Sequence, residues 1–206
     1  MKVEMAATRA NLIAAKETLA MAQEGYDLLS QKREVLLTEL LHLVNDVRRV
    51  QADVASAISE AYTTLRRTLA LVGPDGAHRL IQGCRRLRAD VTVQERSVMG
   101  VPIPLLQLTL SPLHPIWGLG ETPALLDELV QQFHRLVCLL AEQAEIETTV
   151  RRLARELSRT QLRTNALEHV IIPQYQDTVK FIQDTMEERE REEHFVLKRL
   201  KAGRGE

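Results

Sequence analysis

Apolar residues recur at alternating steps of four and three over the first third of the chain, the spacing of one face of a left-handed coiled coil. Between Thr8 and Val72 there is no proline, and Gly25 is the one glycine. The Thr8 hydroxyl is placed to cap the first helical turn. The pattern predicts a helix of about 100 Å, at ~1.5 Å per residue. Its seam positions are Leu12, Ala15, Leu19, Ala22, Tyr26, Leu29, Arg33, Leu36, Leu40, Leu43, Val47, Val50, Val54, Ala57 and Ala61.

A second long helical pattern runs from Pro123, a residue suited to a first helical turn, to about Leu200. Its seam changes phase between Leu140 and Ile146, which predicts a local change of supercoil. Pro173 lies inside the pattern and predicts a bend, because the periodicity resumes beyond it. The seam positions are Leu126, Leu129, Phe133, Leu136 and Leu140, then Ile146, Val150, Leu153, Leu157, Thr160, Thr164, Leu167, Ile171, Gln174, Thr178 and Phe181.

The segment between the two long helices changes character and predicts a turnaround with β structure. Glycine and proline at 73–76 end the first helix. An alternating, β-branched segment predicts one strand, and two prolines confine the start of the next strand to a sheet edge or a bulge. A two-stranded ribbon buries little by itself, so it is expected to lean on the short helix or on another protein. The expected order is a short helix over 77–89 with a basic face (Arg79, Arg85, Arg86, Arg88), strands over 90–98 and 101–110 joined at Met99-Gly100, and a loop over 111–120.

Two long patterns of similar length at opposite ends of one chain predict a mainly α fold with antiparallel arms. The long two-helix coiled coil comprises an N-terminal arm over 1–72 and a C-terminal arm over 121–206. The central turnaround over 73–120 holds the short helix and the β-hairpin. Arg33 is the one charged position of the first seam. Either its aliphatic stem packs while its head reaches the rim, or it pairs with a facing carboxylate, for which Glu168 is the nearest candidate.

Composition agrees with helix packing and excludes several classes of function. Aromatic residues make up 3% of the 206 residues and apolar residues 45%, so the core is built mostly from Leu, Val and Ala. The net charge of −1 argues against a protein that binds nucleic acid through bulk charge. Cys84 and Cys138 have no metal-ligand spacing and are expected to be small buried or half-buried residues. No run approaches the ~18 apolar residues that span a bilayer, so direct membrane insertion is not expected.

The sequence contains no motif for catalysis, phosphate binding or metal ligation. No catalytic, cofactor-binding or metal-ligating residues and no cofactor are therefore predicted. Gly118-Leu119-Gly120 lacks the lysine and the strand–helix context of a phosphate loop, and Glu168-His169 has no second histidine one turn away. A basic stripe falls on every fourth residue of the second arm, at Arg151, Arg155, Arg159 and Arg163. It is either a solvated helix face paired with nearby glutamates or a contact line for an acidic partner surface.

Four stretches carry a family resemblance that covers both arms and the hairpin. Two of them depart from the family pattern, with Ala7 in place of a proline and Ser30 in place of a lysine. The four stretches are Ala7-Thr8-Arg9-Ala10-Asn11-Leu12; Gly25-Tyr26-Asp27-Leu28-Leu29-Ser30-Gln31-Lys32-Arg33; Val98-Met99-Gly100-Val101-Pro102-Ile103-Pro104; and Asn165-Ala166-Leu167-Glu168-His169-Val170-Ile171-Ile172-Pro173 with Glu188-Arg189-Glu190-Arg191-Glu192-Glu193. With these stretches the chain resembles the D subunit of the V-type and archaeal-type rotary ATPases, which is the central-stalk rotor subunit.

The resemblance implies a non-catalytic shaft that couples ATP synthesis or hydrolysis to proton or sodium transport. In this family the paired helices enter the ring of A and B subunits, the middle segment points toward the membrane, the F subunit binds the side of the shaft, and a socket subunit (of the C or d type) joins it to the membrane ring. The resemblance implies a cytoplasmic location, peripheral to the cell membrane. It implies no nucleic acid among the partners. Candidate contacts for these partners are Thr8, Arg9, Lys32, Arg33, Met99, Gly100, Val101, Arg151, Arg155, Arg159, Asn165 and Glu168.

Two other functions remain open at the level of the sequence. A free-standing coiled-coil scaffold or tether shares the long arms but has no need of the Met-Gly-Val ribbon. A helical enzyme that uses the carboxylates of the C-terminal tail is the third possibility. Those carboxylates lie on a solvated helix, where nothing shifts their acidity, so this possibility is the weakest of the three.

Overall fold

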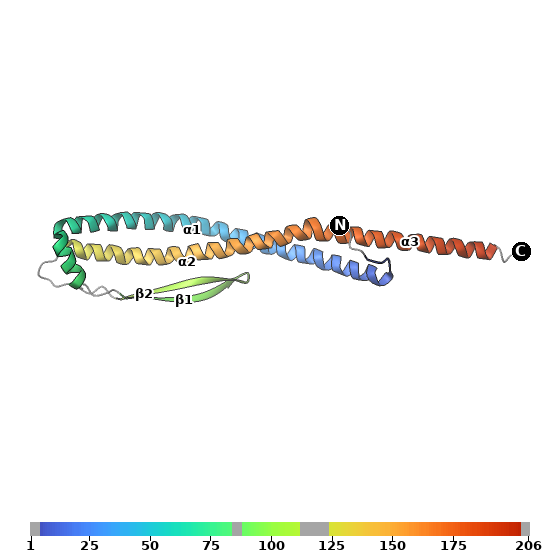
Figure 1. Cartoon of the computed structure of the whole chain (residues 1–206), viewed down its shortest axis with the longest axis horizontal. Coiled ribbons are helices and arrows are strands. Elements are labelled where there is room, and N and C mark those ends of the chain that lie inside the picture. The colour runs from blue at the N-terminus through green and yellow to red at the C-terminus, as the bar shows by residue number, and fades with distance from the viewer. Residues whose placement is uncertain (1–4, 84–87, 112–123, 203–206) are drawn as a thin grey trace. The chain divides into compact units, whose positions relative to one another are not determined.

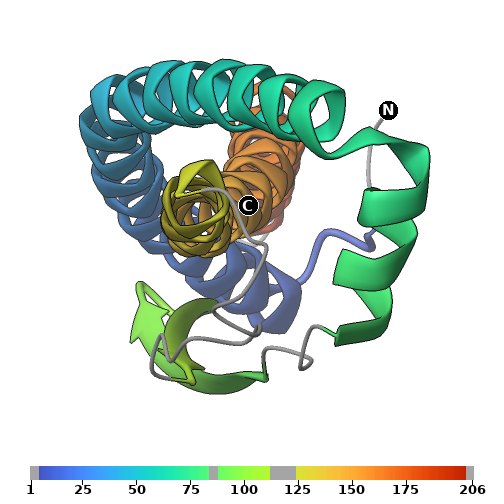
Figure 2. The same cartoon turned by 90° about the vertical axis from the view of Figure 1, so that its left-hand side faces the viewer.

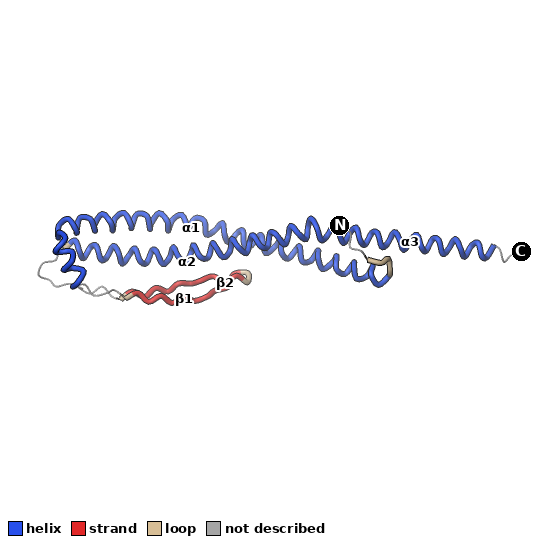
Figure 3. The backbone as a smooth tube through the Cα atoms, viewed as in Figure 1, coloured by secondary structure: helices blue, strands red, loops and turns tan. Residues whose placement is uncertain are grey.

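A computed structural model of the chain describes residues 5–83, 88–111 and 124–202. Helix is the main secondary structure, with one hairpin of two strands (Figures 1 and 3). The chain divides into two compact units, one formed by Met1–Val35 with Leu157–Glu206 and the other by Leu36–Glu156. The elements are α1 (Arg9–Gly83), β1 (Ala89–Val98), β2 (Val101–Leu110), α2 (Leu125–Ala166), the π-helix η1 (Leu167–Ile171) and α3 (Ile172–Ala202).

The N-terminal end of α1 is capped as predicted. The backbone N–H of Asn11 donates to the Thr8 Oγ1 at 3.3 Å, and helical hydrogen bonding starts with Leu12 N–H to the Thr8 carbonyl at 3.0 Å. The Asn11 side chain also donates to the Ala6 carbonyl at 2.8 Å. The bond to the Thr8 hydroxyl satisfies an amide that the first turn cannot satisfy itself, so Thr8 fixes where the helix begins.

The predicted seam of α1 is confirmed, because each of its fifteen positions is buried or half-buried. Arg33 is half-buried among them. The seam continues beyond the predicted positions through Thr64 and Thr68, whose exposed fractions are 7% and 2%. The Thr68 hydroxyl donates to the Thr64 carbonyl at 2.9 Å, so this buried hydroxyl is satisfied within its own helix. The fully buried or nearly buried apolar positions are Ala15, Ala22, Leu36, Val50, Val54, Ala57 and Ala61.

In the unit formed by Leu36–Glu156, α1 packs antiparallel against α2 (Figure 1). The core joins positions 50–61, in the second half of α1, with positions 133–146, centred in the first half of α2, as antiparallel helices require. The rings of Tyr62 and Phe133 contribute to it, with centroids 6.1 Å apart. The cluster comprises Val50, Val54, Ala57, Ala61 and Leu136, with Phe133, Leu139 and Ile146 packed against it.

One seam prediction in α2 is wrong, because Leu139 and not Leu140 packs on this core. Leu140 is 43% exposed. The phase change therefore falls one turn earlier than predicted, where the steps from Phe133 to Leu136 to Leu139 are both of three residues. The two leucines are chemically equivalent and adjacent, so the periodicity alone could not choose between them.

The turn predicted at 73–76 is in fact a sharp corner within α1. Gly73 has φ 71° and ψ 173°, a conformation that is open only to glycine, and the helix restarts at Pro74 and continues to Gly83 (Figure 2). Proline suits the first turn of that new segment because the missing N–H would be unpaired there. The short helix thus begins three residues before the predicted start at Ala77.

Alanine substitutions at two glycines of α1 should change the stability of the chain in opposite directions. A Cβ at Gly25 would lie 4.0 Å from Leu167 Cδ1, which is ordinary contact, so Gly25→Ala should stabilise the chain by about 0.5–1 kcal/mol through helix propensity. A Cβ at Gly76 would lie 2.3 Å from Val72 Cγ1, and Gly76→Ala should destabilise by about 1–3 kcal/mol. Urea unfolding of both variants checks this, and a shift of both midpoints in one direction would contradict it.

As predicted, the helix continues through Pro173. It accommodates the proline through the π-turn η1. The N–H of Ile172 donates to the carbonyl of Leu167, five residues back. This wider turn relieves the clash that a proline ring makes with the carbonyl one turn before it in a regular helix. The unit formed by Met1–Val35 and Leu157–Glu206 therefore contains one helical turn with an extra residue.

The extra residue explains why the predicted seam position Phe181 is wrong. Phe181 is 47% exposed, whereas Ile182 is 0% and Val179 9% exposed. A π-turn adds one residue without advancing the helix face, so beyond it the buried face shifts toward the next residue. Thr178 stays buried as predicted, Val179 is buried beside it, and Ile182 takes the place of Phe181. Thr164, before η1, and Leu167, its first residue, follow the prediction and are buried and half-buried.

The two predicted strands and their turn are confirmed. β1 and β2 pair antiparallel, from Val98 opposite Val101 at the tip to Ala89 opposite Leu110 at the base. Met99 and Gly100 have φ 49° and 78°, as a two-residue hairpin turn requires. At the base, Ser111 N–H donates to the Arg88 carbonyl at 3.0 Å.

Some predictions concern residues outside the described part of the chain. These are the loop at 112–120, the helix start at Pro123, and the environments of Cys84 and of the basic residues Arg79, Arg85 and Arg86. Cys138 is described and exposed, so the expectation that it is buried or half-buried is wrong. It lies on α2 one residue before Leu139, on the face turned away from the core.

Candidate functional site

The hairpin leans on α2, a support that the sequence does not predict. The backbone N–H of Leu106 donates to the Glu145 Oε2 at 2.7 Å. The Arg152 Nη1 donates to the Pro102 carbonyl at 2.8 Å and lies 3.6 Å from the Glu95 carboxylate. We call Glu145 and Arg152 the hairpin clamp. Neither residue was among the contacts predicted from the sequence.

Glu145 and Arg152 form hydrogen bonds with backbone groups of β2 that point away from β1. In a two-residue hairpin the tip pair, Val98 and Val101, exchanges backbone hydrogen bonds, and the pairs alternate from there. Pro102, Pro104 and Leu106 therefore occupy non-hydrogen-bonded positions, where N–H and C=O face outward. Two of these positions are prolines, which have no N–H to satisfy, and this is why a strand with two prolines pairs in full.

The tip residues proposed as partner contacts differ in accessibility. Met99 is 50% exposed and Gly100 is exposed, whereas Val101 is 6% exposed and is buried by this chain itself. On β1 every residue but the half-buried Val98 is exposed, including the apolar Val91 and Val93. The side of the hairpin formed by β1 is thus the accessible one.

The structure brings together the two motif stretches from opposite ends of the chain. Arg9 Nη2 lies 3.3 Å from Glu190 Oε1, and Arg189 Nη1 donates to the Ala7 carbonyl at 3.2 Å. Arg9 and Glu190 are 83% and 56% exposed in their side chains, so solvent screens the pair. The contacts fix register more than they add stability. Thr8 itself is exposed.

The remaining candidates near the middle of the unit formed by Met1–Val35 and Leu157–Glu206 are dispersed. Lys32 and Arg33 are half-buried, while Asn165 and Glu168 are exposed. Among the described residues, the ion pair of Glu168 is with the neighbouring His169 at 4.0 Å and not with Arg33. Of the two alternatives for Arg33, pairing with Glu168 is therefore not formed in this structure.

The basic residues of the second arm are on the surface. Arg151 pairs with Glu147 on its own helix at 2.6 Å, which favours the solvated-face interpretation at that position. Arg155, Arg159 and Arg163 are exposed on α2. The next residue after Arg151, Arg152, is the one that makes a tertiary contact, with the hairpin.

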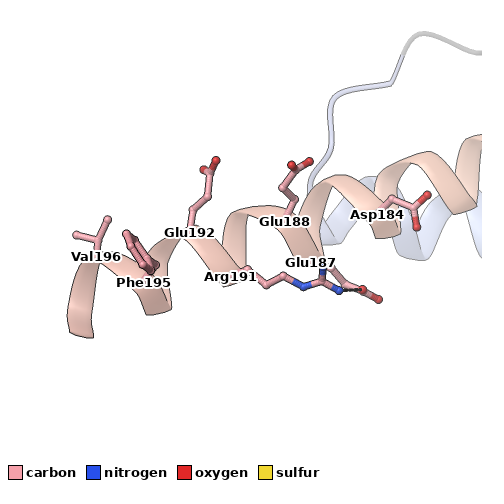
Figure 4. A pocket seen from close by; sticks show the side chains of 7 residues that line it. All are labelled: Asp184, Glu187, Glu188, Arg191, Glu192, Phe195 and Val196. Atoms are coloured by element: carbon pink, nitrogen blue, oxygen red, sulfur yellow. Dashed lines mark hydrogen bonds and ion pairs between the residues drawn. The ribbon is translucent and has the colours of Figure 1, made fainter. Parts of the chain in front are cut away.

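The end of α3 carries apolar side chains that were not among the predicted contacts. Every residue from Glu187 to Lys201 is exposed. An open depression of about 830 Å³ lies along this helix, lined by carboxylates together with Phe195 and Val196 (Figure 4). Arg191 turns toward Glu187, and the two form an ion pair at 3.4 Å. The exposed apolar residues here are Phe195, Val196, Leu197 and Leu200. We call these four the tail patch.

The described residues contain no group of three or more His, Cys, Asp or Glu that could hold a metal ion. In the same part of the chain, no helix combines the length and the apolar character needed to cross a membrane.

Comparison with known proteins gives a single result. The family model for the ATP synthase D subunit matches residues 11–202. The chain is 40% identical to the V-type ATP synthase D subunit of Thermotoga neapolitana, over 97% of this chain and 98% of that protein. It is 33% identical to the A-type ATP synthase D subunit of Methanopyrus kandleri, over 94% and 84%. It is 31% identical to that of Archaeoglobus fulgidus, over 96% of each.

Proposed function

The chain belongs to the family of ATP synthase D subunits, the non-catalytic central-stalk subunits of V/A-type rotary ATPases, and we propose that it is the shaft that carries rotation between the catalytic and the membrane ring. Other subunits of the ATPase are therefore its partners. The shaft transmits torque and couples ATP synthesis or hydrolysis to transport of protons or sodium ions. It acts in the cytoplasm, peripheral to the membrane.

We assign the finer partners from the arrangement of the elements. The arms at 1–72 and 121–206 enter the ring of A and B subunits, the F subunit binds their side, and the turnaround at 73–120 faces the socket subunit (of the C or d type) and the membrane ring. An asymmetric shaft contacts the members of a ring differently, and such differential contacts can bias their conformations.

The tail patch is the observation that most directly supports insertion into a ring. Its residues are between 54% and 62% exposed in the isolated chain. Four large apolar side chains lie at the exposed end of α3, beyond the glutamate-rich run at 187–193 and next to the basic residues Lys198, Arg199 and Lys201. Such side chains form a surface that gains free energy on burial by another protein. A free-standing tether would have no use for such a patch at its tip.

Truncation of the tail tests this function. Removal of residues 194–206 deletes the tail patch but keeps Arg189 and Glu190, which contact the start of the chain. Because the deleted residues are exposed wherever they are described, the melting temperature should change little. In the assembled ATPase, ion pumping per ATP hydrolysed should fall severalfold. Pumping and hydrolysis are measured together in vesicles that contain the complex.

A matched variant separates the apolar side chains from the length of the helix. Phe195→Ser with Val196→Ser and Leu200→Ser retains the full chain and should reproduce the loss of pumping. Glu192→Gln, which changes a charge on the same helix, should leave it near the wild-type level. If the truncated complex pumps as many ions per ATP as the wild type, the proposed insertion into the ring is wrong.

A further inference from the structure

Two side chains of α2 determine how the hairpin is held, and we propose that Glu145 and Arg152 are positioning residues that fix the hairpin in the orientation required for coupling in the assembled ATPase. The inference rests on the proposed function, because it assigns the hairpin a role in assembly. The clamp itself is a property of the isolated chain and can be tested there.

The spacing of the two contacts matches a strand that lies alongside a helix. Glu145 and Arg152 are seven residues apart, two turns on one face of α2, or about 10 Å along its axis. Their targets on β2, Leu106 and Pro102, are four residues apart, or about 13 Å along an extended strand. β2 therefore runs beside α2 in the opposite direction, with a contact at each end of the shared length (Figure 1).

Two separated contacts prevent rotations that one contact would allow. With the Glu145 bond alone, the ribbon could pivot about the Leu106 amide. Arg152 adds the second point, and because it reaches both Pro102 on β2 and Glu95 on β1 it also opposes rolling of the ribbon about its long axis. Hydrogen bonds with one ionised partner are short and roughly twice as strong as neutral ones, and the 2.7 Å and 2.8 Å distances are of this kind.

The clamp covers the outer edge of β2 near the tip of the hairpin. The outward positions there are the prolines at 102 and 104 and the Leu106 amide, which is bonded to Glu145, so this part of the edge offers another strand no free N–H. The outward amides of Leu108 and Leu110 lie beyond the clamp. On β1 every residue but Val98 is exposed, including Val91 and Val93 at 55% and 57%. The clamp therefore sets the direction in which the exposed side of the hairpin points.

Hydrogen exchange in the isolated chain tests the clamp directly. In Glu145→Ala the Leu106 amide should exchange about tenfold faster, the factor that corresponds to losing one hydrogen bond of ordinary net strength. Amides that bond between β1 and β2 should keep their protection, since the ribbon remains paired. Glu145→Gln, whose side-chain oxygen still accepts, should restore part of the protection. Glu142→Ala, an exposed residue on the same helix, serves as the control.

The assembled ATPase tests the positioning role. Ion pumping per ATP should fall in the double variant Glu145→Ala, Arg152→Ala and should recover in part in Glu145→Gln, Arg152→Lys. It should stay at the wild-type level in Glu142→Ala and in Arg135→Ala, whose side chains are exposed on α2. Faster Leu106 exchange together with this loss and this recovery supports the proposal.

Two results would overturn it. The first is a Leu106 amide that exchanges at the wild-type rate in Glu145→Ala, since no clamp then exists. The second is faster exchange with undiminished pumping in the double variant, since the clamp then has no role in coupling. Neither result bears on the tail patch, whose truncation tests the shaft function separately.

Discussion

Leu36→Asp should lower the free energy of unfolding by about 3–5 kcal/mol, because it removes a buried apolar side chain and places a carboxylate where it has no partner. Leu36 is 0% exposed and is one of the largest fully buried side chains of the chain. The loss should shrink as the pH falls toward 4, because burial favours the neutral carboxyl and raises its pKa in the folded state. Urea unfolding at pH 7 and pH 4.5 measures both effects.

The neighbouring residue supplies the control for this variant. Leu37 is 48% exposed, and Leu37→Asp makes the same chemical change on the same helix one position further on. It should cost less than about 1 kcal/mol, mostly through the lower helix propensity of aspartate. Equal losses in the two variants would mean that the three–four alternation of the seam does not describe the packing of α1.

Deletion of one residue should leave the stability nearly unchanged in the π-turn η1, but should lower it in the preceding helix α2. Removing Val170 together with Pro173→Ala should convert η1 into regular α-helix and keep Val179 and Ile182 at the seam, because the π-turn holds one residue more than a regular turn. The melting temperature should stay within a few degrees of the wild type or rise. Circular dichroism at 222 nm follows both helix content and melting.

Deletion of Ser158, an exposed residue of α2, is the matched variant. With Pro173 in place the π-turn persists, so this deletion rotates Thr160 and Thr164 by about 100° out of the seam. Both are nearly fully buried, at 2% and 0% exposed, and the loss of this packing should cost several kcal/mol. If the variant without Val170 were as unstable as the variant without Ser158, η1 would not be an inserted residue that the helix can release.

The helical seams and the hairpin follow from the sequence because burial repeats with the period of the element. A side chain that must face a partner helix at every turn leaves a three–four pattern, and a strand with one open face leaves alternation. The failures occur where that period is interrupted. The period predicts Leu140 in place of Leu139, because both residues are leucines and the pattern cannot separate them. It predicts Phe181 in place of Ile182, because a π-turn leaves no apolar signature of its own.

The candidate site was less accessible to sequence reasoning. Arg9 and the acidic–basic run at 188–193 lie in arms that the sequence predicts to be antiparallel, but the sequence does not identify the contacts that join them. Glu145 and Arg152 bind backbone groups of β2, and a backbone amide or carbonyl carries no residue identity that could be matched to them. The one available signal was the pair of prolines in β2, which marks the edge whose outward groups α2 has to satisfy.

The buried threonines give the two-helix packing a mechanical character of its own. The hydroxyls of Thr68, Thr164 and Thr178 donate to carbonyls one turn back on the same helix, at 2.9, 2.9 and 2.7 Å. None of these bonds ties one helix to its neighbour, so a small axial slip between helices would stretch none of them. At these positions, stiffness against shear comes from interlocking shapes and not from bonds that must break and reform, and an element loaded in alternating directions can then return to its starting geometry.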